Sequence, residues 1–138
     1  MILGFHPQFV PKILNGTKIH TFRKGDRWKA GNSIQMATGV RSKEYKQFNA
    51  NIPELQICKC VQECTIQIYA NEPDVLYKIG LSIANRMILP EHVFLFAYND
   101  GFESLAEFCD WFLEHGTEIY HGIFESKGQI IHWTDNKY

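Results

Sequence analysis

Apolar and polar side chains alternate over several short stretches of the chain, which is the pattern of half-buried β-strands. Strands of this kind are expected at 1–5, 17–23, 33–37, 56–69 and 74–83. A closing hairpin is expected from 119–125 and 129–133 around Ser126-Lys127-Gly128, because Gly-containing segments between apolar runs favour turns.

Helical spacing of apolar residues occurs in three places, 7–14, 90–97 and the segment after Ser104. Ser104 and Glu107 have the spacing of a capping box, which begins a helix whose apolar stripe includes Phe108 and Phe112. Residues 39–55 are polar and are expected to form a long surface loop. About six strands and three helices in mixed order indicate an α+β fold with a curled or barrel-like sheet.

The chain has 138 residues, of which 45% are hydrophobic and 21% charged. This is enough for one domain, covering 1–138, with a substantial core, and it argues against disorder. No apolar run reaches the roughly 18 residues of a membrane span, and the first residues lack the pattern of a signal peptide. A cytoplasmic protein without a membrane partner is therefore expected.

The net charge of −1 conceals an uneven distribution along the chain. Residues 1–60 contain ten Lys and Arg against three Asp and Glu, whereas residues 61–138 contain four against twelve. A basic face that attracts phosphate is compatible with this distribution, and so are two solvated faces that attract each other.

Three cysteines, Cys58, Cys60 and Cys64, share strand parity with Ile66 and Ile68. Cysteine packs as a small hydrophobe, which explains this pattern, and the Cys-x-Cys-x₃-Cys spacing is not typical of zinc sites. No metal and no cofactor are expected, and the free thiols favour a reducing compartment.

The segment Gly16–Arg23 contains the strongest candidate chemistry, because Lys18, Thr21 and Arg23 lie close together after a helix stop. A desolvated lysine can act as a base toward a threonine hydroxyl, and arginine can hold an anion. The alternative is an ordinary strand with one solvated face. In a regular strand Lys18 and Thr21 point to opposite faces, so cooperation requires a bulge or Lys18 placed before the strand.

Two further places have weaker signals. Asp100, in Asp100-Gly101-Phe102, is either a turn residue or a carboxylate presented at the mouth of the sheet. His132 and Trp133 are either a stacking surface for a base or buried at the end of the closing strand. Trp28 and Tyr45, which are flanked by cations, offer the same stacking chemistry.

The motif Gly16-x-Lys18-x-x-Thr21-x-Arg23, followed by Arg27-x-Lys29-x-Gly31, resembles the signature of the ASCH domain family of the PUA-like superfold. The segment Asp100-Gly101-Phe102-x-Ser104 and the ending His132-Trp133 are also similar to that family. The resemblance covers about residues 5–138. It implies a small mixed β-barrel with flanking helices that binds RNA or nucleotides.

Within that family, some small bacterial members are N(4)-acetylcytidine amidohydrolases that use a Lys, a Thr and a Glu. The resemblance places these roles on Lys18, Thr21 and Asp100, with Asp in place of Glu and a side chain shorter by one methylene. It implies an RNA- or nucleotide-binding cleft with ligand contacts from His20, Arg23, Lys24 and Trp28. The alternative is an amidohydrolase acting on an acylated nucleoside, so the partner is RNA, a nucleotide or a modified nucleoside.

Overall fold

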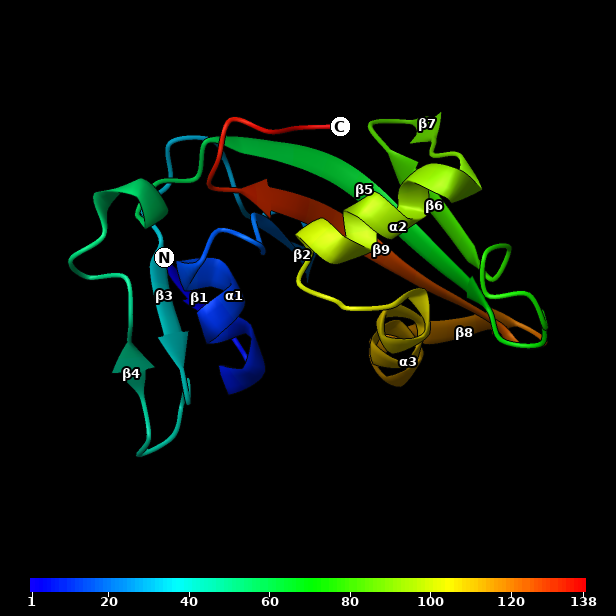
Figure 1. Ribbon diagram of the computed structural model, residues 1–138, viewed down its shortest axis with the longest axis horizontal. Coiled ribbons are helices and arrows are strands. Elements are labelled where there is room, and N and C mark those ends of the chain that lie inside the picture. The colour runs from blue at the N-terminus through cyan, green and yellow to red at the C-terminus, as the bar shows by residue number, and fades with distance from the viewer.

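Two β-sheets form the framework of the protein, whose computed structural model describes all 138 residues (Figure 1). The smaller sheet has the order β1-β3-β4, in which β1 and β3 are parallel. Its strands are β1 (Ile2–Gly4), β3 (Gln35–Thr38) and β4 (Lys46–Gln47). The chain is α+β, as expected, and the two sheets share no ladder that would close a barrel.

The larger sheet is antiparallel, with the order β2-β9-β5-β6-β7, and β8 also pairs with β9. Its strands are β2 (His20–Lys24), β5 (Cys60–Tyr69), β6 (Ile79–Ile83), β7 (Arg86–Met87), β8 (Thr117–Tyr120) and β9 (Ile123–His132). The strands number nine rather than about six, and β4 and β7, with two residues each, are too short to give a sequence pattern.

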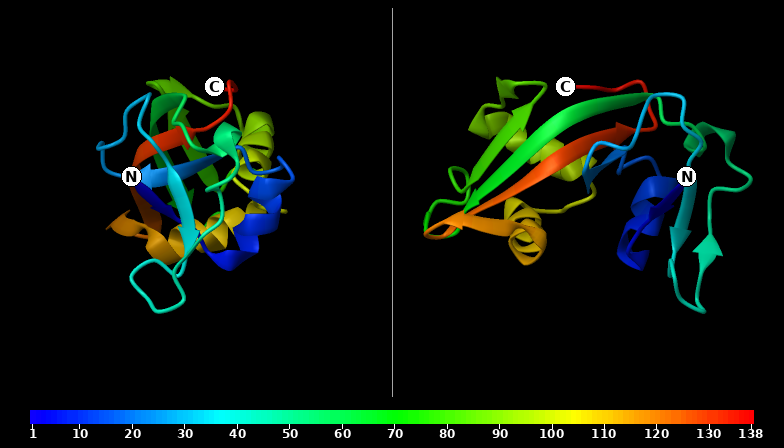
Figure 2. Two further views of the ribbon diagram at one scale, coloured as in Figure 1. Left: turned by 90° about the vertical axis from the view of Figure 1, so that its left-hand side faces the viewer. Right: turned by 180° about the vertical axis from the view of Figure 1, so that it is seen from behind.

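The helices lie beside the sheets, with α2 and α3 next to the long β5–β9 pair and α1 next to β1 and β3 (Figures 1 and 2). They are the 3₁₀ helices η1 (Pro7–Phe9) and η2 (Pro53–Leu55) and the α-helices α1 (Val10–Leu14), α2 (Pro90–Asn99) and α3 (Leu105–His115). None of them is long and apolar enough to cross a membrane.

One cluster of 24 buried apolar residues joins both sheets to the helices. Alternation along β5 places Cys64, Ile66 and Ile68 in this core, which confirms the parity argument for Cys64, whereas Cys60 is only half-buried and Cys58 is buried before the strand begins. All four cysteines are free thiols, and no group of three or more His, Cys, Asp or Glu side chains is arranged to hold a metal ion.

The N-terminus of α3 confirms half of the capping box. Ser104 Oγ accepts a hydrogen bond from the Glu107 backbone N–H at 3.1 Å. The Glu107 carboxylate, however, accepts from the N–H of Glu103 rather than of Ser104. The cap thus fixes the residues that connect α2 to α3, which border the site described below.

The expected hairpin around Ser126-Lys127-Gly128 is wrong. Those residues lie inside β9, and the turn falls at His121-Gly122, where Gly122 has a φ of +72°. Gly128 is opposite Lys24 of β2 and Cys64 of β5, and a Cβ there would overlap the carbonyl oxygen of Arg23. The glycine therefore permits close approach of strands rather than a turn.

Two other expectations need correction. The strand expected over 74–83 begins only at Ile79, because the Asp74 carboxylate accepts the N–H of Leu76 and forms a turn. The segment 39–55 contains β4, η2 and Asn49, which is fully buried and bonds to the backbone of Ile34 and Leu55. The polar composition of this segment therefore did not indicate that one of its residues is buried and hydrogen-bonded in the core.

Candidate functional site

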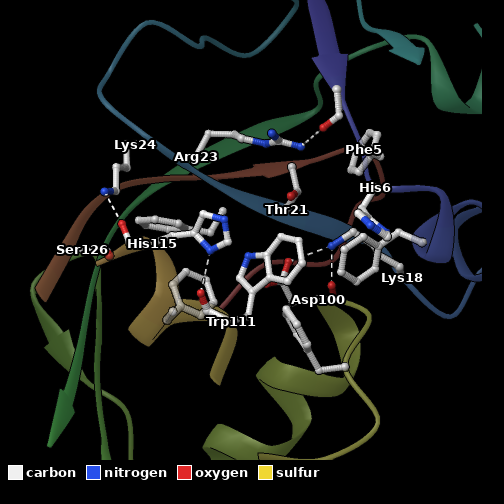
Figure 3. A pocket seen from close by; sticks show the side chains of 15 residues that line it. Phe5, His6, Lys18, Thr21, Arg23, Lys24, Asp100, Trp111, His115 and Ser126 are labelled. Carbon is white, nitrogen blue, oxygen red and sulfur yellow. Dashed lines mark hydrogen bonds and ion pairs between the residues drawn. The ribbon is translucent and has the colours of Figure 1, made fainter. Parts of the chain in front are cut away.

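A cavity of about 370 Å³ lies where β2 faces the connection between α2 and α3 (Figure 3). Lys18 and Asp100 lie toward one end of it, Lys24 and His115 toward the other, and Trp111 between them (Figure 3). Its walls are contributed by Gly4, Phe5, His6, Phe9, Lys18, Thr21, Phe22, Arg23, Lys24, Asp100, Phe102, Trp111, Phe112, His115 and Ser126. The cavity is at the small end of the roughly 300–1,000 Å³ that small-molecule sites occupy.

Lys18 precedes β2, and its position is set by backbone hydrogen bonds on both sides. Its N–H donates to the carbonyl of Lys12, and the N–H of Ile19 donates to the carbonyl of Asn99 at the end of α2. Because β2 begins only at His20, the parity rule does not separate Lys18 from Thr21, and both line the cavity.

The ammonium of Lys18 forms an ion pair with Asp100 that is almost completely buried. Lys18 Nζ lies 2.9 Å from Asp100 Oδ1 and also donates to the Asp100 carbonyl. Asp100 is the C-terminal cap of α2, where the helix dipole favours a cation. The ammonium also lies 4.9 Å from the centroid of the Phe9 ring, within the range of a cation–π contact.

Burial lowers the pKa of Lys18, while Asp100 partly opposes this shift. Burial alone would raise the pKa of Asp100, but the charge of Lys18, together with His20, lowers it below its ordinary value. Asp100 is therefore a carboxylate at neutral pH. Of the two partners, only Lys18 has a pKa shifted in the direction that disfavours its charged form.

His20 lies behind Asp100, away from the cavity, and is fully buried. Its Nε2 lies 2.7 Å from the hydroxyl of Tyr138, which also accepts a hydrogen bond from Asn99. The Tyr138 hydroxyl keeps its own proton to donate to Nε2, and the ring proton is then on Nδ1, which faces Asp100 Oδ1 at 3.5 Å without a hydrogen bond of good geometry. Burial lowers the pKa of His20, so the ring is neutral and supports Asp100 rather than contacting a ligand.

Arg23 lines the cavity from β2 and is held in place by the first strand. Its Nη2 donates to the carbonyl of Gly4, and its guanidinium lies 5.1 Å from the centroid of Phe5. Burial lowers the pKa of Arg23 to about 10, and its Nε is buried without a hydrogen-bond partner. Arg23 thus brings a positive charge and an unused donor to the cavity wall.

The opposite wall contains an aromatic pair that the sequence patterns did not single out. Trp111 and His115 stack with centroids 4.9 Å apart. His115 Nδ1 lies 2.7 Å from the Trp111 carbonyl, which can only accept, so Nδ1 carries the proton and a neutral ring leaves Nε2 as an acceptor. Lys24 Nζ donates to the His115 carbonyl, which joins the two walls. The i, i+4 spacing of an aromatic and a histidine on α3 is the signal that could have identified this pair.

The structure brings five of the seven sequence-predicted site residues to one cavity, namely Lys18, Thr21, Arg23, Lys24 and Asp100. Thr21 makes no side-chain hydrogen bond to Lys18. His20 lies behind the cavity, and Trp28 is buried in the core, where its backbone bonds to Gln129.

Of the two alternatives for the end of the chain, the buried one is confirmed. His132 and Trp133 are both buried, and His132 Nε2 lies 3.0 Å from Gln62 Oε1. Neither side chain is accessible to a base, because His132 packs against His20 and Tyr138 and Trp133 packs against Phe5.

The comparisons with known proteins identify no relative. No family model matches the chain, and neither a curated protein nor a solved structure matches it.

Proposed function

We propose that the cavity binds one nucleotide or modified nucleoside, as the resemblance to the ASCH domain family and its PUA-like superfold implies. The observation that supports this is a cationic wall facing an aromatic wall across one small cavity. Arg23 and Lys24 supply positive charge on β2, and the Trp111–His115 stack supplies an aromatic surface on α3. Phosphate is attracted to the first and a nucleobase stacks on the second.

The charge balance of the cavity supports an anionic ligand. Asp100 is the only carboxylate in the lining, and it is already paired with Lys18. Arg23 and Lys24 form no ion pair with any carboxylate of the chain, so their charge is available to a phosphate. A neutral apolar ligand would leave these cations without a partner in a partly enclosed site.

Calorimetric titration with the four ribonucleoside 5′-monophosphates, together with quenching of tryptophan fluorescence, tests this proposal. We expect Trp111→Ala to weaken binding by about tenfold or more, because base stacking on aromatic side chains contributes about 1–3 kcal/mol. Lys24→Gln should weaken binding and reduce its salt dependence.

The matched controls are Tyr120→Ala and Lys78→Gln, which remove an exposed aromatic and a cation outside the cavity. They should bind as the wild type does. The proposal fails if no nucleotide or nucleoside binds, or if the control variants lose as much affinity as the cavity variants.

A second candidate function is amide hydrolysis on an acylated nucleoside such as N(4)-acetylcytidine, and one observation favours it. Lys18 has a pKa lowered by burial and shares the cavity with Thr21. In this reaction the uncharged amine of Lys18, which its lowered pKa favours, would take the Thr21 proton while Thr21 Oγ1 attacks the acyl carbon. The resulting Lys18 ammonium would return that proton to the departing amine. Water would then release the acid from the threonine ester.

Incubation with N(4)-acetylcytidine, followed by chromatography for cytidine, tests this second function. Release of cytidine that persists in Thr21→Ser but is lost in Thr21→Ala and Lys18→Ala would support it. Tight binding of the nucleoside without any release would contradict it and leave the binding proposal intact.

A further inference from the structure

A second hollow, which the functional proposal above does not use, adjoins the cavity. This basic groove has a volume of about 730 Å³ and is lined by Met1, Ile2, Leu3, Gly4, Arg23, Lys24, Arg27, Trp28, Val40, Arg41 and Tyr45. Gly4, Arg23 and Lys24 line both hollows, so the groove and the cavity share a wall.

The groove contains four cationic side chains and no carboxylate. Arg27 follows β2, and Arg41 lies in the connection between β3 and β4. Neither arginine makes an ion pair, and neither side chain makes a hydrogen bond within the protein. Like charges repel one another, so an unneutralised group of cations gains most from an anionic partner with several charges.

The β3–β4 hairpin supplies one side of this groove and projects from the rest of the molecule (Figures 1 and 2). It contributes Arg41 and also Tyr45, whose side chain is 44% exposed. The Tyr45 hydroxyl can donate to a phosphate, and its ring gives a base beside that phosphate a surface on which to stack. The groove therefore has surfaces for both parts of a nucleotide chain.

We infer that the basic groove binds the backbone of a single-stranded nucleic acid whose neighbouring nucleotide occupies the cavity. This inference rests on the proposed function, because it places the cavity nucleotide within a longer strand. The strand is single because a base in a duplex is stacked and paired, and it reaches an enclosed cavity only after it is extruded. The cations at the shared wall, Arg23 and Lys24, lie where the strand passes from cavity to groove.

The test compares a single-stranded hexaribonucleotide with the 5′-monophosphate and the 5′-triphosphate of the same nucleoside, by fluorescence anisotropy and calorimetry. The variant is Arg27→Gln/Arg41→Gln, which leaves every cavity residue in place. The control is Lys78→Gln/Lys127→Gln, which removes the same charge from positions that do not line the groove.

We expect the hexanucleotide to bind the wild type more tightly than the monophosphate does. In Arg27→Gln/Arg41→Gln its affinity should fall by on the order of tenfold or more at about 50 mM salt, with a salt slope smaller by about 1.4. Monophosphate affinity should stay within about twofold, because two arginines outside the cavity contribute little to one phosphate.

Three results would overturn the inference. The hexanucleotide could bind the wild type no better than the monophosphate, or the control variant could lose as much affinity as the groove variant. The triphosphate could match the hexanucleotide in affinity and in sensitivity to Arg27→Gln/Arg41→Gln, which would make the groove a site for the phosphates of a free nucleotide. If the hexanucleotide binds through the groove but no mononucleotide binds, the proposed function is contradicted, and so is the placement of the neighbouring nucleotide in the cavity. Binding of the strand in the groove would still stand.

Discussion

Mild acid should destabilise this protein through a histidine far from solvent. His132 is fully buried in β9, and its Nε2 lies 3.0 Å from Gln62 Oε1. That oxygen can only accept, so the ring proton is on Nε2, and Nδ1 is buried without a partner. Burial, and to a lesser extent the nearby His20, lowers the pKa of His132 from 6.5 to about 4.

The direction of the effect follows from the lowered pKa. Between pH 6.5 and about 4 the unfolded chain binds a proton at His132 that the folded protein does not, so stability falls as the pH falls. The full difference corresponds to about 3 kcal/mol, and the part lost between about pH 7 and about pH 5 is about 2 kcal/mol. His20, whose pKa is also lowered by burial, adds to this loss in the same direction.

Urea unfolding followed by circular dichroism at a series of pH values measures the loss. We expect His132→Gln to flatten the pH dependence, because an uncharged amide at this position does not titrate while it still donates to Gln62. The control His121→Gln, at an exposed turn position, should keep the slope of the wild type. A wild-type loss below about 0.5 kcal/mol, or an undiminished loss in His132→Gln, would refute the reasoning.

Three further predictions concern stability at neutral pH and are checked by urea unfolding. Asp100→Asn should cost about 3–5 kcal/mol, because it leaves the Lys18 ammonium buried without its counter-charge, and the double variant Lys18→Met/Asp100→Asn should cost less than the single one. Ser104→Ala should cost about 1 kcal/mol through loss of the α3 cap, and Ser104→Asp, which retains an acceptor, should cost less. Gly128→Ala should cost about 3 kcal/mol or more, since the added methyl group would push Arg23 of β2 away from β9, and a cost below about 1 kcal/mol would contradict the strand register.

The patterns along the chain predicted those helices and strands that have one face in the core and the other toward solvent. Alternation predicted β5 because Ile66 and Ile68 face the core, and spacing predicted α3 because Phe108 and Phe112 do so. The turn expected at Gly128 was wrong because local composition does not distinguish a glycine that bends the chain from one that admits a neighbouring strand.

The candidate site was predictable only in part, because its geometry is long-range. Lys18 and Asp100 are 82 residues apart and meet through a backbone contact between Ile19 and Asn99 that no periodicity reveals. The resemblance to a family motif suggested the pair, whereas Trp111 and His115 were missed because aromatic residues on an amphipathic helix usually signal core packing. Trp28 was expected beside the other ligand contacts, but flanking cations do not indicate which way an indole points, and Trp28 is buried next to the groove rather than the cavity.

The position of β9 in the larger sheet affects how the protein acquires its shape during synthesis. Both β2 and β5 are bonded to β9 and not to each other, yet β9 is the last strand along the chain. While a ribosome is still translating the helices, β2 has no strand to bond, and the two cavity walls lack β9, which contacts both β2 and α3 in the finished fold. A nascent chain therefore cannot hold a ligand at this site until β9 has left the ribosome. Because β9 pairs with strands far from it in the sequence, we expect the sheet to form slowly after that point.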